Sequence, residues 1–432
     1  MQDVSAVARE SVIALLVRRW RDPAGWATAA DIFVILIALS LPWSTTLVGI
    51  FGAASIVTMA PFLDLKAFLQ SLTRPICAMP IALFALAVVG MLWSDAPWAT
   101  RLYAIGPASK LLMLPLLFHH FERSARGVQV FVAFLASCML LLAMSWIVVF
   151  DPGLALKPEA AYGVPVKNYI DQSQEFALCA VALAFPIVTL LRTNRIMQEL
   201  LLSAIALSFV VNMAFVTVSR TALVTMPIML AVFALLHLKR RSILIIFCTA
   251  IVLAGLAWVA SPHLRWTAAT FVRDYQTYKE LNQPTSIGLR LEFWEKSLRF
   301  FAEAPIIGHG TGSTQRLFER AATGPKVLAA GQVISNPHNQ TLNVAVQWGV
   351  TGIVVLYAMW LVHLLLFRGD GLVAWIGLLV VVQNIFSSLF NSHISDFNEG
   401  WMYVLGVGIA GGMVLKTGSR EATSGPRNSA RS

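Results

Sequence analysis

The chain has 432 residues, of which 57% are hydrophobic and only 12% are charged. Soluble domains carry about 25% charged residues, so this composition excludes an ordinary soluble protein. It also excludes a disordered chain, because disorder needs low hydrophobicity and high charge. The formal net charge of +10 would suggest nucleic acid binding in a soluble protein. In a membrane protein, it indicates basic cytoplasmic loops and contact with anionic membrane lipids instead.

Apolar runs long enough to cross a bilayer recur along the chain with short breaks. We therefore predict an all-α, polytopic membrane protein with about twelve transmembrane helices: nine within 28–261 and three within 338–415. The predicted spans are 28–44, 46–61, 78–94, 103–118, 128–150, 174–191, 198–217, 220–238, 243–261, 338–367, 372–390 and 400–415. We predict that residues 1–27 form a cytoplasmic amphipathic segment rather than a secretory signal. The polar residues 416–432 are predicted to form a disordered cytoplasmic tail.

The distribution of lysine and arginine predicts the orientation of these spans. With a cytoplasmic N-terminus, basic clusters such as Arg18–Arg19 and Lys239–Arg241 fall on the cytoplasmic side. The short outward loops then hold only these basic residues: Arg101, Lys157, Lys167 and Arg220. We expect both termini in the cytoplasm, since the number of spans is even.

The predicted cytoplasmic loops are too short for a nucleotide-binding domain, and no G-x-x-x-x-G-K-[ST] motif occurs. This argues against an ATP-driven pump and against an enzyme that uses a cytosolic nucleotide sugar. The longest soluble segment, residues 262–337, is predicted to be a helical loop on the outer side. We therefore expect the functional residues at the outer ends of the spans.

His338 lies in the sequence SNPHNQ at 335–340. Asn336 suits a helix N-cap and Pro337 suits the first helical position, so we expect His338 in the opening turn of a span. A helix N-terminus disfavours imidazolium, which would keep the ring neutral and able to accept a proton. The sequence leaves two interpretations open: a catalytic base, or an interfacial histidine at a helix start.

Arg220 follows Ser219 and opens a span at its outer end, where arginines are scarce. The helix amides there point outward, which suits a phosphate ligand, whereas the alternative is an anchor among lipid head groups. Arg290 belongs to a predicted helix over 286–304 with Ser286 as its cap. It projects beside the apolar stripe of that helix and away from the other charges. We expect an anionic partner for Arg290, either a glutamate, a lipid head group or a substrate phosphate.

Metal chemistry has weaker support, because neither D-x-D nor H-E-x-x-H occurs. Asp396 and Glu399, in the sequence HISDFNE at 393–399, could hold a cation. A solvated loop, or a carboxylate partner for His338 or an arginine, is the favoured interpretation. We predict no metal and no cofactor.

Four features in order over residues 200–367 resemble the O-antigen ligase family, with its relatives the O-antigen polymerases and bacterial O-linked oligosaccharyltransferases. They are Ser219-Arg220-Thr221 at the start of a span, Arg290 and Trp294 in the long loop, the segment 304–312 (APIIGHGTG), and Pro337-His338-Asn339. The third is similar to the family's Pro-x-x-Gly-x-Gly segment. His309 between the two glycines departs from the family pattern, which leaves open whether that position is structural or touches substrate.

The resemblance implies a metal-independent, inverting glycosyltransferase of the membrane-embedded helical type in the inner membrane of a Gram-negative bacterium. The donor would be a glycan on undecaprenyl pyrophosphate, and the acceptor would be a sugar hydroxyl of lipid A-core, both on the periplasmic side. His338 matches the proposed base, and Arg220 and Arg290 match the pyrophosphate-binding arginines. Asp396 matches an acidic residue of the last outward loop, with His309 and Asn339 as possible supporting residues.

The sequence does not separate a ligase from an O-antigen polymerase or a protein O-oligosaccharyltransferase. A transporter is a further alternative, but it predicts charged residues deep inside several spans. Of the charged residues in the predicted spans, we expect only Lys110 to lie deep in the membrane. Membrane lipids, the lipid-linked glycan and lipid A-core are thus the expected partners, with neither nucleotide nor nucleic acid among them.

Overall fold

The computed structural model describes residues 22–157, 162–216 and 218–423. Within those ranges every regular element is a helix, and none is a strand, which confirms the predicted all-α class. Most of the predicted N-terminal segment 1–27 lies outside the described residues.

The predicted spans up to residue 261 all coincide with helices. These are α2 (Pro23–Ser40), α3 (Thr45–Met59), α5 (Pro75–Val89), α6 (Trp98–Ser109), α7 (Met113–Phe121), α8 (Gly127–Phe150), α9 (Tyr169–Ala182), α10 (Ala184–Arg192), α11 (Ile196–Phe215), α12 (Arg220–His237) and α13 (Arg240–Ala260). The short helix α4 (Leu65–Ser71) lies between two predicted spans. A 3-10 turn, η2 (Lys110–Leu112), joins α6 to α7. Proline at the first position of α2 and α5 fits these starts, because that position needs no backbone N–H donor.

Three helices lie in the long segment between the spans: α14 (Pro262–Leu281), α15 (Ser286–Glu303) and α16 (Thr314–Ala321). The chain then returns through α17 (Gln340–Leu366), α18 (Leu372–Ser387) and α19 (Phe397–Thr423). The helix α19 continues eight residues beyond the predicted start of the tail at 416, so the prediction of disorder does not hold for 416–423. Residues 424–432 of that predicted tail lie outside the described residues.

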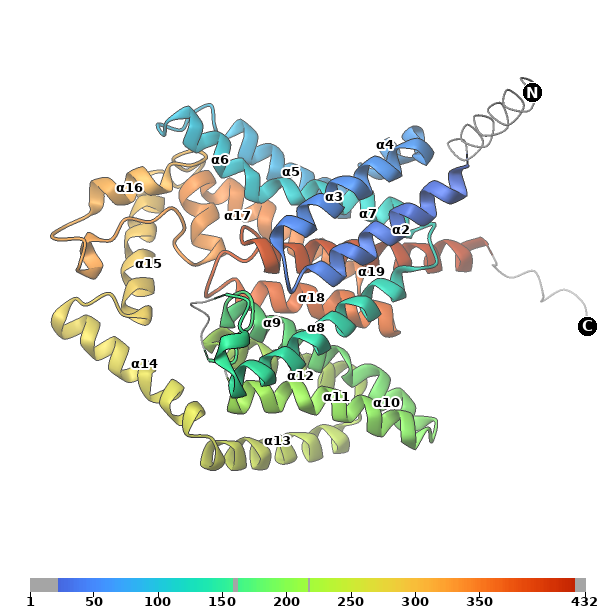
Figure 1. Cartoon of the computed structure of the whole chain (residues 1–432). Coiled ribbons are helices and arrows are strands. Elements are labelled where there is room, and N and C mark those ends of the chain that lie inside the picture. The colour runs from blue at the N-terminus through green and yellow to red at the C-terminus, as the bar shows by residue number, and fades with distance from the viewer. Residues whose placement is uncertain (1–21, 158–161, 217, 424–432) are drawn as a thin grey trace, which may run out of the picture.

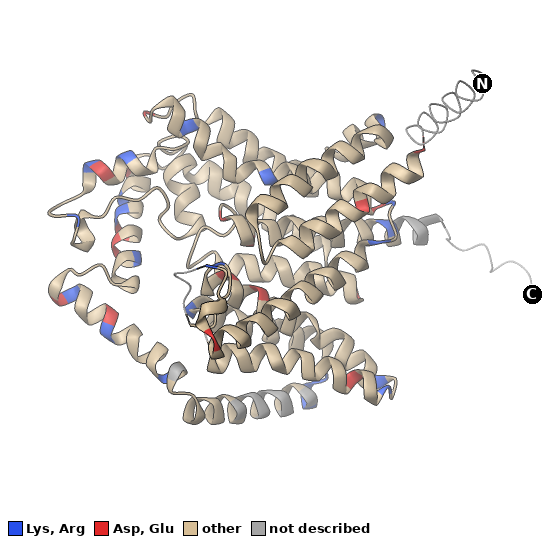
Figure 2. Ribbon diagram, in the orientation of Figure 1, with Lys and Arg blue, Asp and Glu red and all other residues tan. Residues whose placement is uncertain are grey.

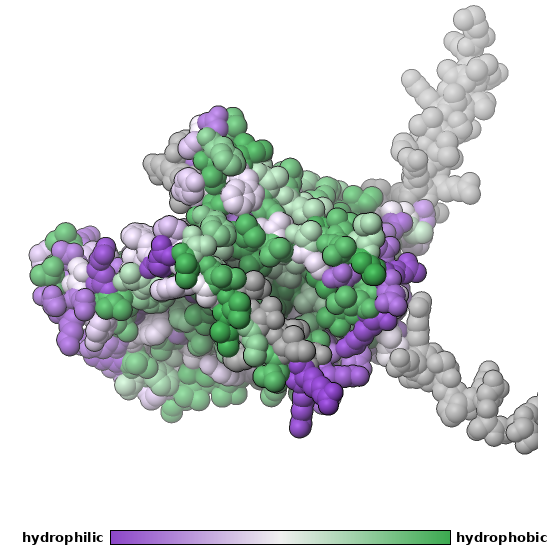
Figure 3. Space-filling model, turned by 90° about the horizontal axis from the view of Figure 1, so that it is seen from below, coloured by the Kyte–Doolittle hydropathy of each residue, from purple (hydrophilic) through white to green (hydrophobic). Residues whose placement is uncertain are grey.

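Eight helical stretches of the described chain are long and apolar enough to cross a membrane, or nine if the bent pair α4–α5 is one span. The helix α18 is a shorter apolar helix of 16 residues. The polytopic helical membrane fold is therefore confirmed, while the number twelve stays a prediction. Figure 3 shows hydrophobic side chains across the broad middle of one face, with hydrophilic ones gathered toward its ends.

The long segment lies at one end of the helical bundle. In Figure 1, α14, α15 and α16 stand at the left, whereas α2 begins and α19 ends at the right. Charged residues are sparse along the bundle and frequent on α14, α15 and α16 (Figure 2). One end of the bundle is thus covered by polar helices that no predicted span includes.

The segment 305–312 forms backbone hydrogen bonds with α17 at the point where that helix is broken. Gly349 interrupts α17 with a φ of 62°, and Val350 N donates to Pro305 O at 2.7 Å. Gly308 also has a positive φ, and a Cβ there would meet the Gln347 carbonyl carbon at 2.5 Å. Glycine is required at both positions because a side chain would block this approach. The glycine-rich segment therefore holds α15 against the first half of α17.

Candidate functional site

His338 lies just before α17 rather than in its opening turn. Asn339 is the N-cap, since its Oδ1 accepts from Leu342 N at 3.0 Å, and the helix begins at Gln340. The expected cap Asn336 instead accepts from His338 N at 3.0 Å. This short turn holds His338 at a φ of 54°, a conformation that non-glycine residues seldom adopt. The predicted helical position of His338 was therefore wrong, although the residue stays next to the helix start.

The imidazole of His338 is held on two sides and is half-buried. Its Nδ1 lies 2.8 Å from Asn391 Oδ1, and its ring stacks on Phe293 of α15 with centroids 6.1 Å apart. Burial lowers the pKa of His338 below its usual value, and the charge of Arg290 lowers it further, while the hydrogen bond to Asn391 opposes both. The neutral ring expected from the sequence is thus favoured, but burial takes the place of the helix terminus as the cause.

Arg290 reaches the same place from α15. Its Nε donates to Phe390 O at 3.2 Å, next to Asn391, and its Nη1 donates to Ser286 Oγ at 2.9 Å. Thr285, not Ser286, caps α15, which leaves the Ser286 hydroxyl for this contact. Among the described residues, Arg290 forms no ion pair with a carboxylate. The expected anionic partner is therefore not a side chain of the described chain.

Arg220 is the first residue of α12, as the sequence predicts, and Ser219 is the N-cap of that helix. Its guanidinium is already paired, because Nη1 lies 2.9 Å from Asp274 Oδ2 and Nη2 donates to Thr270 Oγ1 at 2.7 Å, both on α14. The ring of Phe271 lies 4.6 Å from the same guanidinium. Arg220 is close enough for its charge to lower the pKa of Arg290, although burial is the larger cause. The three predicted residues therefore share one end of the bundle.

Asp396 connects to His338 through an intermediary that the sequence analysis missed. Asn391 Nδ2 donates to Asp396 Oδ2, while Asn391 Oδ1 faces His338. Lys110, on η2, donates to the backbone carbonyls of Ser395 and Asp396 and so holds the loop. Burial raises the pKa of Asp396 to about 6, an effect that the charge of Lys110 opposes. No sequence pattern predicts that an asparagine between two spans will link an aspartate to a histidine.

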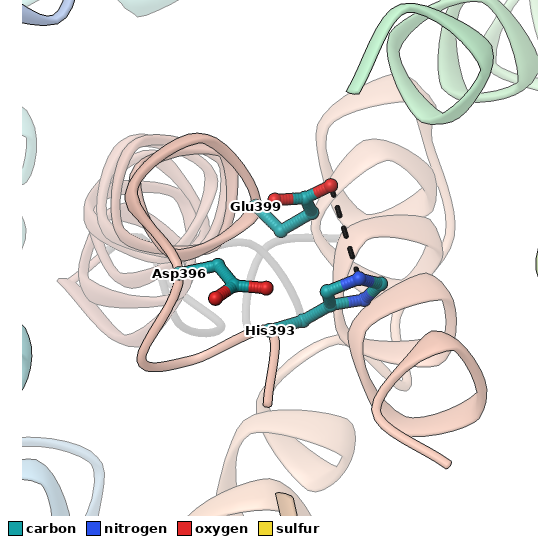
Figure 4. A group of neighbouring side chains, drawn as sticks. All are labelled: His393, Asp396 and Glu399. Carbon is teal, nitrogen blue, oxygen red and sulfur yellow. Dashed lines mark ion pairs between the residues drawn. The ribbon is translucent and has the colours of Figure 1, made fainter. Parts of the chain in front are cut away.

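His393, Asp396 and Glu399 form the one group in the described chain that could hold a metal ion, with ligand atoms within 4.8 Å of one another (Figure 4). His393 Nδ1 bonds Ser387 Oγ, while its Nε2 and Glu399 Oε1 are buried, 3.8 Å apart and without a hydrogen-bond partner. The expectation of a solvated loop was wrong, since His393 and Glu399 are 0% and 6% exposed. A nearby lysine, Lys167, donates to Asn398 and supplies positive charge to this region.

A buried polar side chain cluster on α9 adjoins that group. Asn398 Nδ2 donates to Asp171 at 2.8 Å and lies 3.5 Å from Glu175, which is buried within α9. Lys110 is therefore not the one charged residue buried inside the bundle. These contacts tie α19 to α9 and so fix the loop that carries Asn391 and Asp396.

His309 and Asn339, the other two candidates, hold the frame of the site. The His309 ring bonds Phe300 O of α15 at 2.8 Å, and its backbone N donates to Val346 O of α17 at 2.9 Å. Asn339 caps α17 and also donates to Leu389 O at 3.1 Å. In this structure, both residues join the elements that carry His338, Arg290 and Asn391.

The comparisons with known proteins agree with these motifs. A family model described as O-antigen ligase matches residues 205–357, a range that includes Arg220, Arg290 and His338. An O-antigen ligase of Pseudomonas aeruginosa is 27% identical over 323 residues, which cover 65% of this chain and 76% of that protein. An uncharacterized protein of Haemophilus influenzae is 33% identical over 119 residues, 26% of this chain and 29% of that protein.

Proposed function

The chain belongs to the O-antigen ligase family, and from that premise we propose that it transfers a glycan from undecaprenyl pyrophosphate to a sugar hydroxyl of lipid A-core. The reaction would take place at the periplasmic face of a Gram-negative inner membrane. The observation that carries this proposal is the convergence of His338, Arg290 and Arg220 at one end of the bundle.

His338 acts as the base in this proposal. Its Nδ1 is engaged with Asn391, so Nε2 is the nitrogen left to take the proton of the acceptor hydroxyl. The hydroxyl oxygen attacks C1 of the donor sugar while the bond from C1 to the pyrophosphate oxygen breaks, and the configuration at C1 inverts. A positioned base of this kind contributes about 10²–10⁴-fold to the rate.

The two arginines stabilise the departing pyrophosphate. A guanidinium forms two parallel hydrogen bonds to phosphate oxygens, which matches the charge that develops on the leaving group. Arg290 has only uncharged partners and is free to take an anion. Arg220 would exchange the carboxylate of Asp274 for a phosphate oxygen. Pyrophosphate is a good leaving group, so the mechanism needs no separate general acid.

The test is transfer by the purified protein from lipid-linked glycan to lipid A-core, without ATP. Glycan on lipid A-core would support the proposal. Extension of another lipid-linked glycan would identify a polymerase, and modification of a protein acceptor would identify an O-oligosaccharyltransferase. In a deletion strain, the ligase predicts a core that lacks all O-antigen, whereas a polymerase predicts a core with one repeat unit.

A further inference from the structure

We propose that Asn391 is a positioning residue that keeps the proton of the neutral His338 ring on Nδ1, so that Nε2 is free to accept a proton. This inference rests on the proposed function and assigns a role in it to a residue that touches neither donor nor acceptor. It is carried by one chain of hydrogen bonds that runs from Asp396 through Asn391 to His338.

The carboxylate of Asp396 determines which way the amide of Asn391 points. An ionised carboxylate only accepts hydrogen bonds, so the group that faces it must be the donor Nδ2. The Oδ1 of Asn391 is then turned toward His338 at 2.8 Å. A carbonyl oxygen only accepts, so His338 Nδ1 must carry the hydrogen. In the neutral ring, Nε2 is then the acceptor.

The reversed amide would be unfavourable in this setting. It would place Oδ1 against the carboxylate of Asp396, where two acceptors repel each other, and would turn Nδ2 toward His338. A ring that accepts at Nδ1 carries its hydrogen on Nε2 and cannot take a proton there. Lys110, whose charge stabilises the ionised form of Asp396, therefore also supports the productive orientation.

The same loop fixes the position of His338 as well as its tautomer. Ser392, next to Asn391, donates to Asn336 Oδ1 at 2.6 Å, and that oxygen also accepts from His338 N. Asn391 and Ser392 thus hold the ring and the backbone of His338 at once. On the other side, the ring of Phe293 stacks on the imidazole.

Two substitutions at Asn391 separate this role from a structural one. Asn391→Leu has a similar volume but no acceptor, so we expect kcat to fall roughly 10²-fold while donor binding is retained. Asn391→Asp keeps an acceptor for Nδ1–H, and a proton shared with Asp396 replaces the lost amide donor, so it should retain far more activity than Asn391→Leu. Its added carboxylate should move the acid limb of the kcat/KM profile to higher pH, because a facing negative charge raises the pKa of the imidazole. Gln315→Leu, which removes an exposed amide on α16, is the matched control.

A double variant completes the experiment. Because Asn391 acts through His338, the combination of Asn391→Leu with His338→Ala should be no slower than His338→Ala alone. If Asn391→Leu has the wild-type kcat while His338→Ala is inactive, this inference is overturned and the proposed function stays intact. An independent further loss in the double variant would also overturn it. An active His338→Ala would instead remove the base from the proposed function itself.

Discussion

Two arginines at the same end of the bundle have opposite surroundings. Arg290, on α15, bonds a backbone carbonyl and a serine hydroxyl and has no carboxylate partner among the described residues. Arg220, at the start of α12, is paired with Asp274 and bonded to Thr270. The charge of Arg290 is thus left without a carboxylate partner in the described chain, whereas the charge of Arg220 is already paired.

The difference indicates how much each arginine gains from a phosphate. Arg290 gives up only uncharged hydrogen-bond partners when it binds phosphate. Most of the attraction between its guanidinium and the phosphate therefore adds to donor binding. Arg220 must first lose a charge-assisted hydrogen bond to Asp274, which offsets part of what phosphate contributes. We therefore expect Arg290 to matter more to transfer than Arg220.

Of the two arginines, Arg290 should give the larger effect when it is lost. Arg290→Ala should lower kcat/KM about 10²–10³-fold, as the loss of one preorganised donor does in other enzymes. Arg290→Lys should recover only part of this, because an ammonium cannot form the paired hydrogen bonds. Arg299→Ala, an exposed arginine on the same helix, is the control. If Arg290→Ala transfers at the wild-type rate, Arg290 is a structural residue of α15.

A smaller effect is expected at the paired arginine. Arg220→Ala should reduce transfer less than Arg290→Ala does, and Asp274→Asn should lower the donor KM because phosphate no longer competes with a carboxylate. Steady-state kinetics with the lipid-linked donor would measure both. If Asp274→Asn loses as much transfer activity as Arg220→Ala does, Asp274 positions Arg220 in the working enzyme. That result would contradict the idea that Asp274 competes with phosphate for Arg220.

The sequence predicts the parts of this site that depend on local pattern. The start of α12 at Arg220 follows from the apolar run that begins there, and the helix that carries Arg290 follows from its periodicity, although Thr285 caps it in place of the predicted Ser286. The N-terminus of α17 was misplaced because Asn336 and Asn339 both suit an N-cap. The choice between them depends on tertiary contacts, such as Gln340 N donating to Ser388 O at 2.9 Å.

The partners of the site residues lay beyond sequence analysis for a different reason. Each site residue contacts a partner that is distant along the chain. Arg220 pairs with Asp274, His338 with Asn391, and Asp396 with Lys110. A single sequence contains no signal that pairs them. The loop 393–399 looks solvated by composition, and its burial results from packing against α9 and Lys110.

The pH dependence should reveal the Asp396 end of the hydrogen-bond chain. Burial raises the pKa of Asp396 to about 6, whereas burial lowers the pKa of His338 below its usual value. We expect kcat/KM to decline as the pH drops through about 6, because protonated Asp396 no longer fixes the amide of Asn391. Asp396→Asn should remove this step from the profile. A step that persists in Asp396→Asn would belong to another group.

The smallest expected effect is that of a chelator. The proposed mechanism assigns the leaving-group charge to two guanidiniums, so EDTA should leave the transfer rate unchanged. Activity that EDTA abolishes and a divalent cation restores would contradict this assignment. The group of His393, Asp396 and Glu399 would then become the candidate metal site, and His393→Ala should lose the restoration.

The most direct test of the account is the transfer rate of His338→Ala, measured together with its binding of the lipid-linked donor. The ring takes the acceptor proton in this mechanism, while Arg290 and Arg220 hold the donor. We predict that His338→Ala loses transfer and still binds the donor like the wild type, whereas His309→Ala and His393→Ala lose less. A His338→Ala enzyme that transfers at a near wild-type rate would contradict the account and direct attention to Asp396 or Glu399 as the base.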